Sequence, residues 1–371
     1  MIAALLFLSI SIGYGVTILL ILRGWKRIPV QYSQSQRKVS ILVVYRNEIE
    51  HIKPLLFSLK AQNYPQELME FVFIDDHSED DGSELLQNEL NHFLSEVQHL
   101  SLPKDKIGKK NGIELGVDVS KNEWILMTDA DCIVPPNWVS SMAGMGHADF
   151  VSGPVAYKAS KSILGKLVAL DFISMITLGG ALISKGSPVL ANGANMMFKK
   201  ACFKEVGGYA GNHNIVSGDD IFLLDKFASH NKSVAFNKSN KAIVETAMVN
   251  SFKLFVNQRV RWAKKTQYSK RTSKHATLQI LTLSYLAFFI SPLIGVLSNR
   301  SEVWVVIGFA WMIKLIIDLI YFWHMLKFFN RLHLLLYILL IEIIHPIYIV
   351  SIAVLSLFKS FTWKQRSVNY G

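Results

Sequence analysis

The stretch Glu-Trp-Ile-Leu-Met-Thr-Asp-Ala-Asp, residues 123–131, decides how the central part of this chain folds. Residues 123–128 form a short apolar run with the length and composition of a buried β-strand. The run ends in Asp129 and Asp131, two carboxylates that can both reach one hard divalent cation, such as Mg²⁺ or Mn²⁺. Asp also favours turns, so an acidic turn is the alternative. The strand before this motif and Pro135-Pro136 after it favour a metal site.

Two earlier apolar runs also end in polar residues. Residues 38–44 end in Tyr45-Arg46-Asn47-Glu48, and residues 70–74 end in Asp75-Asp76-His77-Ser78, with a helical stretch through about Gln62 between them. Strands that alternate with helices predict an α/β domain with a parallel sheet covered on both faces. Ligands bind at the carboxyl ends of such strands, so the three polar ends are predicted to surround one site. For Asp75 and Asp76, the alternative is that they cap a helix expected after Asp81.

The hydrophobic residues are concentrated at the two ends of the chain. Of the 371 residues, 51% are hydrophobic and 18% are charged, against about 25% charged in an average soluble protein. Residues 1–22 carry no charged side chain and are long enough as a helix to cross a bilayer core of about 30 Å. Residues 276–297, 303–325 and 334–358 are three further apolar segments. We therefore expect an integral, multi-pass protein of the plasma (inner) membrane.

Basic residues flank these apolar segments. Arg23, Lys26, Arg27, Arg37 and Lys38 follow the first segment, and eight Lys or Arg residues lie between Ser251 and His275 without an acid. The positive-inside rule places both flanks in the cytoplasm. Anionic lipid head groups attract such residues at about 1 kcal/mol each. Attraction to the membrane surface therefore accounts for the net charge of +11. No nucleic-acid-binding motif accompanies them, so membrane lipids, and not nucleic acid, are the expected partner.

This distribution predicts four regions. They are a retained transmembrane anchor at 1–22, a cytosolic domain at 23–275 that ends in an amphipathic basic segment, a transmembrane region at 276–358, and a basic tail at 359–371. Four full spans would place that tail outside the cytoplasm, and the alternative is that one of the last two segments is interfacial or re-entrant. Cys132 and Cys202 lie far apart, which argues against a disulfide framework and a cysteine metal site.

Ionisable side chains interrupt the last two apolar segments. Lys314 and Asp318 are four residues apart, a spacing at which they can pair on one face of a helix. Glu342 and His345 are three residues apart, and they either face that pair or line an acceptor pathway. Structural pairing is the favoured interpretation.

Three more motifs have side chains suited to a phosphate or a hydroxyl group. Gly108-Lys109-Lys110-Asn111-Gly112 is a glycine-flanked basic pair that could face a phosphate. Asp219-Asp220 precedes an apolar helix, where a partly desolvated carboxylate could accept a proton or could simply cap the helix. Gln258-Arg259-Val260-Arg261-Trp262 offers arginine for phosphate and tryptophan for a sugar face or the membrane interface, and is otherwise the pattern of an amphipathic surface helix.

Taken in order, these motifs resemble those of the family 2 glycosyltransferases over about residues 38–266. The set comprises Glu48, Asp75-Asp76, Lys109, Asp129-Ala130-Asp131, Asn192-Gly193-Ala194-Asn195, Gly207-Gly208-Tyr209, Asp219-Asp220 and Gln258-x-x-Arg261-Trp262. The closer resemblance is to the membrane-embedded branch with the cellulose, chitin, hyaluronan and poly-N-acetylglucosamine synthases and ceramide glucosyltransferase.

The resemblance implies a GT-A fold, with a mixed, mostly parallel sheet, and inverting transfer from a nucleotide-diphosphate sugar, here expected to be a UDP-sugar. It implies that Tyr45, Arg46, Glu48, Asp75 and Asp76 lie around the nucleotide, that Lys109 approaches the diphosphate, and that Asp129 and Asp131 bind Mg²⁺ or Mn²⁺. It also implies that Asp220 is the general base and that Gln258, Arg261 and Trp262 close over the diphosphate and shape the acceptor site. Independently of the resemblance, an inverting displacement needs one base on the acceptor side and a cation opposite it.

The expected function is transfer to a lipid-linked or polysaccharide acceptor at the cytoplasmic face of the membrane. One alternative is a processive synthase of a secreted polysaccharide, for which the membrane portion is small. The other is a non-catalytic membrane scaffold. A degenerate enzyme of that kind would be expected to have lost at least one of four residues that are all present here: Asp129, Asp131, Asp220 and Arg261.

Overall fold

The structure, a computed structural model, consists of two compact units. It describes residues 2–30, 36–213, 215, 217–249, 251–273, 275–358, 361–363 and 366–368. The α/β unit comprises Ile28–Lys158, Leu182–Met248 and Thr362–Gly371, and the helical unit comprises Met1–Arg27, Ala159–Ala181 and Val249–Phe361. Each unit is described by itself below.

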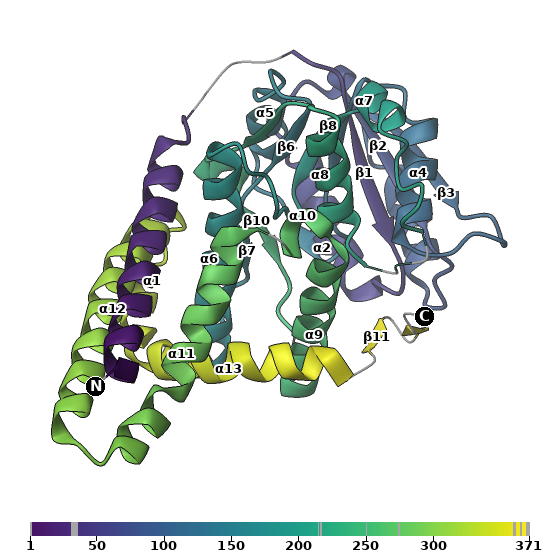
Figure 1. The fold of residues 1–371 in the computed structure, drawn as a ribbon. Coiled ribbons are helices and arrows are strands. Elements are labelled where there is room, and N and C mark those ends of the chain that lie inside the picture. Colours follow the sequence, from purple (N-terminus) through teal and green to yellow (C-terminus); the bar gives the residue numbers. More distant parts are fainter. Residues whose placement is uncertain are drawn as a thin grey trace. The chain divides into compact units, whose positions relative to one another are not determined.

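The α/β unit is built around a seven-stranded sheet with the order β3-β2-β1-β4-β8-β6-β9 (Figure 1). All neighbouring strands pair in parallel except β8, which is antiparallel to β4 and to β6. The strands are β1 (Val39–Tyr45), β2 (Met69–Asp75), β3 (Glu96–Ser101), β4 (Trp124–Met127), β6 (Phe150–Ser152), β8 (Met196–Lys199) and β9 (Val234–Phe236). A small second sheet pairs β5 (Cys132–Ile133), β10 (Val244–Thr246) and β7 (Val155–Tyr157). The predicted mixed, mostly parallel sheet is confirmed.

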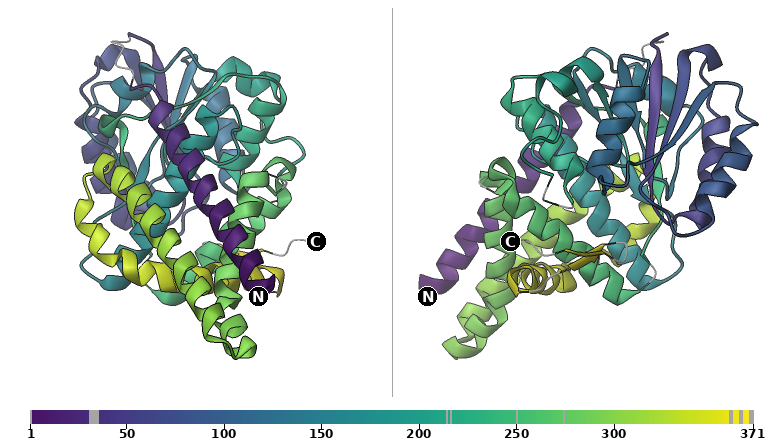
Figure 2. Two further views of the ribbon diagram at one scale, coloured as in Figure 1. Left: turned by 60° about the vertical axis from the view of Figure 1, so that its left-hand side comes forward. Right: turned by 90° about the vertical axis from the view of Figure 1, so that its right-hand side faces the viewer.

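Helices cover both faces of the large sheet, as its two-sided apolar strands require. They are α2 (Ile49–Lys60), α3 (Gly82–Leu90), α4 (Lys109–Val119), α5 (Trp138–Ala143), α7 (Lys200–Glu205) and α8 (Asp219–Ser229). Every residue of β1 and β2 is buried, which explains why both strands are mostly apolar, and the buried polar side chains of Ser40 and Glu70 are hydrogen-bonded to each other. On one face Leu42 and Val44 pack with Ile113 of α4, and on the other the ring of Phe71 lies 4.9 Å from that of Phe93. Figure 2 shows helices on both sides of the strands.

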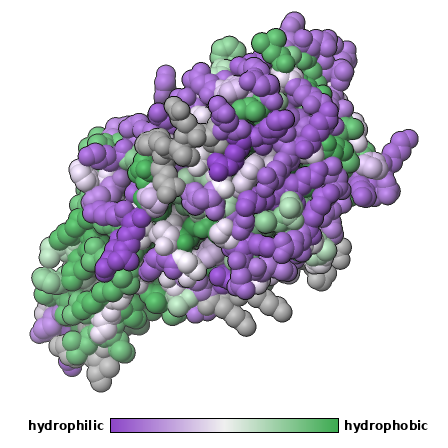
Figure 3. Space-filling view, turned by 90° about the horizontal axis from the view of Figure 1, so that it is seen from above, coloured by the Kyte–Doolittle hydropathy of each residue, from purple (hydrophilic) through white to green (hydrophobic). Residues whose placement is uncertain are grey.

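The helical unit contains long apolar helices. Its elements are α1 (Ile2–Arg27), α6 (Ile163–Ser184, within the unit as far as Ala181), α9 (Phe252–Tyr268), α10 (Lys270–Ser273), α11 (Ala276–Ser298), α12 (Ser301–Phe328) and α13 (Ile338–Phe358). In the described part of the chain, five helices are long and apolar enough to cross a membrane: α1, α6, α11, α12 and the segment Leu332–Phe358. Hydrophobic side chains gather on the surface of these helices, which is typical of protein in contact with lipid (Figure 3).

Four of these five helices match the predicted apolar segments, and α6 was not predicted. It lies inside residues 23–275, where the sequence analysis expected only a cytosolic domain. Lys166 and Asp171 interrupt its apolar run, which conceals its length in the sequence. The boundaries of the cytosolic domain stay a prediction. In the basic tail, only β11 (Phe361–Trp363) and β12 (Arg366–Val368) are described, and Lys359 and Lys364 lie outside the described residues.

The predicted ion pair in α12 is present and belongs to a larger buried group. Lys314 Nζ lies 2.7 Å from Oδ2 of Asp318 and 2.5 Å from Oε2 of Glu342 in α13. The hydroxyl of Tyr14 in α1 donates to both oxygens of Asp318, at 2.7 and 2.8 Å. Three apolar helices are therefore joined by paired charges, as the structural interpretation predicted for Lys314, Asp318 and Glu342, whereas His345 pairs with Asp171 instead.

We expect Gly116→Ala to destabilise the α/β unit. A Cβ at this position would lie 2.9 Å from Leu42 Cδ2 and closer still to Cδ1, and Leu42 is fully buried in β1. Overpacking of this kind costs about 1–3 kcal/mol, of which the better helix propensity of Ala offsets about 1 kcal/mol. Thermal unfolding in detergent should show a melting temperature lower by a few degrees. Gly308→Ala in α12 is the control, because no atom lies within 4 Å of its Cβ, and an equal loss there would refute the packing argument.

Candidate active site

The carboxyl ends of β1, β2 and β4 meet at one edge of the sheet. Tyr45 pairs in register with Asp75, and Leu42 pairs with Met127, so the loops after the three strands are neighbours. These loops begin with Arg46, Asp76 and Thr128. The predicted gathering of three polar strand ends is therefore present in the α/β unit.

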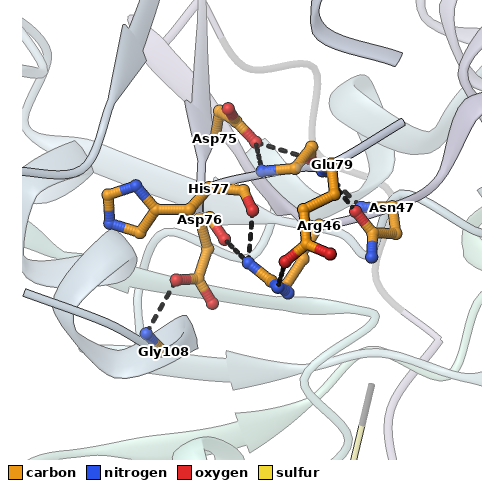
Figure 4. A network of polar contacts seen from close by, with 8 residues as sticks. Arg46, Asn47, Asp75, Asp76, His77, Glu79 and Gly108 are labelled. Carbon is orange, nitrogen blue, oxygen red and sulfur yellow. Dashed lines mark hydrogen bonds and ion pairs between the residues drawn. The ribbon is translucent and has the colours of Figure 1, made fainter. Parts of the chain in front are cut away.

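Arg46 ties the loop after β1 to the loop after β2 (Figure 4). Its Nη1 donates to the carbonyl oxygen of Asp76 at 2.8 Å and to that of His77, and its Nη2 donates to the Glu79 carboxylate at 2.6 Å. The Arg46 side chain is 7% exposed, whereas its Glu79 partner is 69% exposed, so the bonds to the two carbonyl oxygens are the more shielded from water. The Arg46 guanidinium thus connects two loops of the chain. Its contact with a nucleotide stays a prediction, and a nucleotide would have to share the N–H donors that these loops use.

The acidic pair after β2 shapes the same loops (Figure 4). Asp75 Oδ1 accepts hydrogen bonds from the backbone N–H and the hydroxyl of Ser78, at 2.9 and 2.6 Å. Asp76 Oδ1 accepts from the backbone N–H of Gly108 at 2.9 Å, which links this loop to the start of α4. Helix α3 follows Asp81, and neither carboxylate caps it. Their predicted role around the nucleotide is untested.

Two further predicted nucleotide ligands have partners within the α/β unit. The Tyr45 hydroxyl lies 2.8 Å from Nε2 of His99 in β3, and burial raises the pKa of Tyr45. Glu48 Oε2 lies 2.7 Å from Nδ1 of His51 one turn into α2. Both side chains stand next to the strand-end loops, and their contact with a nucleotide stays a prediction.

The Lys109 ammonium joins the acidic motif at residues 129–131 to the acidic motif at residues 219–220. Its Nζ lies 2.6 Å from Asp129 Oδ1 and 2.9 Å from Asp219 Oδ2. Burial lowers the pKa of Lys109, but the two carboxylates outweigh it and hold the pKa above its usual value. Burial also raises the pKa of Asp129, and Lys109 offsets part of that rise. The structure therefore assembles a compact group of opposite charges from the end of β4, the start of α4 and the start of α8.

Gly193 closes one side of this group. A Cβ at position 193 would lie 2.8 Å from Asp219 Oδ2 and 3.1 Å from Lys109 Nζ, so a larger residue there would push these two side chains away from their present positions. Asn195, which is fully buried, anchors that loop: its Nδ2 donates to the carbonyl oxygens of Pro154 and Ala242, at 2.9 and 2.8 Å. The Asn-Gly-Ala-Asn motif thus acts through its backbone and one buried amide.

Asp129 and Asp131 are suited to a divalent cation. In the described residues no three His, Cys, Asp or Glu side chains are grouped so as to hold a metal by themselves. Asp131 Oδ2 accepts a hydrogen bond from Thr246 at 3.3 Å, and the side chain of Asp129 is 35% exposed. Two hard oxygen donors at an accessible edge fit a cation that takes its other ligands from a diphosphate and water.

The second acidic motif lies in the first turn of α8. Gly218, with φ of 88°, precedes the helix, so Asp219 and Asp220 are helical residues and neither is the N-cap. Asp219 is engaged by Lys109, whereas Asp220 is 7% exposed and its Oδ1 accepts from the backbone N–H of Ile221 at 2.8 Å. The two neighbouring carboxylates thus have different surroundings.

Lys110 has a role that sequence reasoning missed. Its Nζ donates to the carbonyl oxygens of Asn212 and Ile215, at 2.7 and 2.5 Å, and lies 4.7 Å from the Phe222 ring centroid. Burial lowers its pKa to about 8. Lys109 faces carboxylates and Lys110 holds the loop before α8, so the basic pair is divided between two tasks that the sequence does not distinguish.

Gln258, Arg261 and Trp262 lie on α9 in the helical unit. Phe255, Arg259 and Val260 are buried residues of this helix, and the three predicted residues are half-buried. The α/β unit contains the other predicted residues. The role of this motif over a diphosphate stays a prediction.

Comparison with known families agrees with this geometry. The model of glycosyl transferase family group 2 matches residues 124–358, more than half of the chain, and that of glycosyl transferase family 2 matches residues 40–204. The chain belongs to the family 2 glycosyltransferases. The predicted enzyme class is thereby confirmed.

Curated relatives of this glycosyltransferase include poly-β-1,6-N-acetyl-D-glucosamine synthases. The protein of Staphylococcus epidermidis (strain RP62A) is 25% identical over 186 residues, and that of Staphylococcus aureus (strain COL) is 27% identical over 182 residues. The aligned parts cover 47% and 46% of this chain, and 42% and 41% of the relatives. The chain thus spans less than half the length of the curated relatives it matches.

A solved structure confirms the GT-A fold. The mannosyltransferase PcManGT from Pyrobaculum calidifontis, in complex with GDP-Man and Mn²⁺, superposes with a TM-score of 0.59 at 16% sequence identity. The superposition covers 91% of this glycosyltransferase and 99% of the other chain. S. aureus TarS 1–349 in complex with UDP gives a TM-score of 0.43 at 16% identity, over 90% of this chain and 97% of TarS.

We expect Lys109→Met to strengthen metal binding in the absence of nucleotide. The ammonium occupies Asp129 Oδ1, so a cation at Asp129 and Asp131 must compete with it. Removing one positive charge beside the ion should favour binding by at least about 1.4 kcal/mol, or about tenfold in affinity. The measurement is Mn²⁺ titration by electron paramagnetic resonance. Lys106→Met, at an exposed neighbouring lysine, controls for net charge, and unchanged affinity in Lys109→Met would contradict competition.

Proposed function

We propose that this glycosyltransferase transfers a sugar, with inversion, from a nucleotide-diphosphate sugar to a hydroxyl of a lipid-linked or glycan acceptor at the cytoplasmic face of a membrane. The observation that carries the proposal is the meeting of Asp129, Lys109 and Asp219 at the carboxyl edge of the sheet, with Asp220 beside them in the chain. An inverting transfer needs cationic groups at the leaving diphosphate and a base for the acceptor, and both kinds of residue are present.

The donor diphosphate suits the start of α4. The N-terminus of a helix favours anions, and the Lys109 side chain adds a positive charge at the first turn of α4. Tyr45, Glu48, Asp75 and Asp76 would then hold the nucleoside, with Arg46 fixing their loops. We propose a UDP-sugar as donor. The structure of PcManGT contains GDP-Man, so GDP-sugars belong in any donor panel.

Asp129 and Asp131 would hold Mg²⁺ or Mn²⁺, and the ion when bound would supply charge neutralisation for the diphosphate. The Mn²⁺ in the complex of PcManGT supports this assignment. The residues of this chain would contribute the two carboxylates, the Thr246 hydroxyl that orients Asp131, and Lys109 as a second cation for the same phosphates.

Removal of divalent metal should abolish sugar transfer. Treatment with EDTA leaves Lys109 as the cation of this group, which is insufficient for a diphosphate leaving group carrying more than one negative charge. Transfer from a radiolabelled UDP-sugar should fall at least a hundredfold and return when Mn²⁺ or Mg²⁺ is added in excess. Full activity in EDTA would contradict the assignment of Asp129 and Asp131.

Asp220 is proposed as the base that takes the proton of the acceptor hydroxyl. Asp219 is held by Lys109, and a carboxylate paired with an ammonium is the weaker base of the two. The partly desolvated position of Asp220 at the start of α8 suits proton transfer.

The variant Asp220→Asn should lose transfer while it keeps donor binding. A general base contributes about 10²- to 10⁴-fold, so kcat should fall by that factor. The dissociation constant for UDP with Mn²⁺, measured by calorimetry, should change less than threefold. Asp225→Asn, later in the same helix, is the control. Unchanged transfer by Asp220→Asn would overturn the assignment of the base.

A processive polysaccharide synthase is the second candidate function. The poly-β-1,6-N-acetyl-D-glucosamine synthases among the relatives favour it, and the five helices within the described residues that could cross a membrane are compatible with it. Incubation of membranes with UDP- and GDP-sugars separates the candidates, since a lipid-soluble product indicates single additions to a lipid and a polymeric product indicates a synthase.

The basic residues around α9 and α10 support a multi-pass protein whose α/β unit faces the cytoplasm.

A further inference from the structure

Asp171 is a buried carboxylate in an apolar helix. It is 5% exposed and is the only acidic residue in α6. A buried charge without a partner costs several kcal/mol, so ionisable side chains in apolar helices are paired or functional. The partners of Asp171 therefore indicate what it does.

Two other helices of the helical unit supply these partners. Arg259 Nη2 in α9 lies 2.8 Å from Asp171 Oδ2, and His345 Nε2 in α13 lies 3.1 Å from Asp171 Oδ1. The Arg259 side chain is 2% exposed, so its pair with Asp171 is removed from water. One carboxylate thus joins three helices that are far apart in the sequence.

The same arginine contacts the tryptophan of the predicted acceptor motif. The Arg259 guanidinium carbon lies 4.4 Å from the ring centroid of Trp262 and 5.1 Å from that of Phe255. The ring of Phe172, next to Asp171 in α6, lies 5.9 Å from the ring of Trp262. Trp262 therefore contacts both the guanidinium of Arg259 and the ring of Phe172 in α6.

Because α9 is a helix, the contacts of Arg259 also restrict the directions of Gln258 and Arg261. Phe255, Arg259 and Trp262 are at positions i, i+4 and i+7, and so lie on one face of α9. Successive side chains are about 100° apart around the axis, which places Gln258 and Arg261 on the adjoining face. Fixing Arg259 fixes the rotation of α9, and with it the direction of Gln258 and Arg261.

We infer that Asp171, Arg259 and His345 form a positioning network that sets the rotation of α9 and thereby orients Gln258, Arg261 and Trp262 for sugar transfer. The inference rests on the proposed function and on the predicted role of these three residues in it. The network acts through α9 and does not itself touch the substrate. A purely structural ion pair, such as Lys314–Asp318, would stabilise the helices without affecting the motif.

The test compares Asp171→Asn with Asp318→Asn, each of which removes one buried carboxylate charge from the same unit. We expect kcat at saturating donor to fall at least tenfold in Asp171→Asn, while the dissociation constant for UDP with Mn²⁺ changes less than twofold. In Asp318→Asn, where Lys314 keeps Glu342, kcat should change less than threefold even if the melting temperature falls. Asp171→Glu should recover part of the loss.

A chemical reporter measures the rotation of α9 without any need for activity. Cys132 and Cys202 are both buried, so a cysteine at Gln258→Cys can be labelled selectively with a maleimide. Its labelling rate should change at least threefold when Asp171→Asn is added, and should stay the same with Asp318→Asn.

An unchanged labelling rate and kcat in Asp171→Asn would overturn the inference, and so would equal losses of kcat in the two carboxylate variants. If the wild-type protein transferred sugar from no donor of the panel, the proposed function would fail instead. The labelling rate would then still decide whether Asp171 sets the rotation of α9.

Discussion

The ammonium of Lys109, between Asp129 and Asp219, is the interaction on which the candidate site depends. The carboxylates of Asp129, at the end of β4, and Asp219, at the start of α8, lie 2.6 and 2.9 Å from this ammonium. Without a cation between them, the two carboxylates would repel each other. The neighbouring structure serves the same contact: Asp76 holds the turn at Gly108 before α4, and Gly193 leaves room for the lysine and Asp219. One ammonium between two carboxylates leaves a net charge of about −1, so the proposed metal ion and diphosphate would add charges of both signs to a group that still carries one negative charge.

The helical unit obeys the same physics in apolar surroundings. Lys314 is paired with Asp318 and Glu342, and Asp171 is paired with Arg259 and His345. Because burying an unpaired charge is costly, each group can form only when its helices are correctly assembled. Buried charges therefore specify how these helices pack, which apolar contacts alone would leave less well defined.

Much of the fold was predictable because its signals are local. The strands β1, β2 and β4 are mostly apolar, since helices cover both faces, and each is followed by polar residues. Strand β3 was missed because it is an edge strand with a half-exposed, polar pattern. Helix α6 was missed because Lys166 and Asp171 interrupt its apolar run, although both have partners in the folded unit: Lys166 donates to the Tyr337 hydroxyl at 2.8 Å.

The class of the protein, the edge of the sheet that carries the candidate site and the carboxylates that gather there could all be predicted from the sequence, because chain order and strand polarity place those residues. The contacts of each charged side chain are evident only in the folded chain. Arg46 and Lys110 resemble phosphate ligands in the sequence, yet they donate to backbone carbonyl oxygens of loops distant in the chain. Arg259 lies inside the Gln-Arg-Val-Arg-Trp motif but was not among its predicted site residues, and it is the buried partner of Asp171. These roles follow from contacts between residues far apart along the chain, and such contacts leave no local pattern.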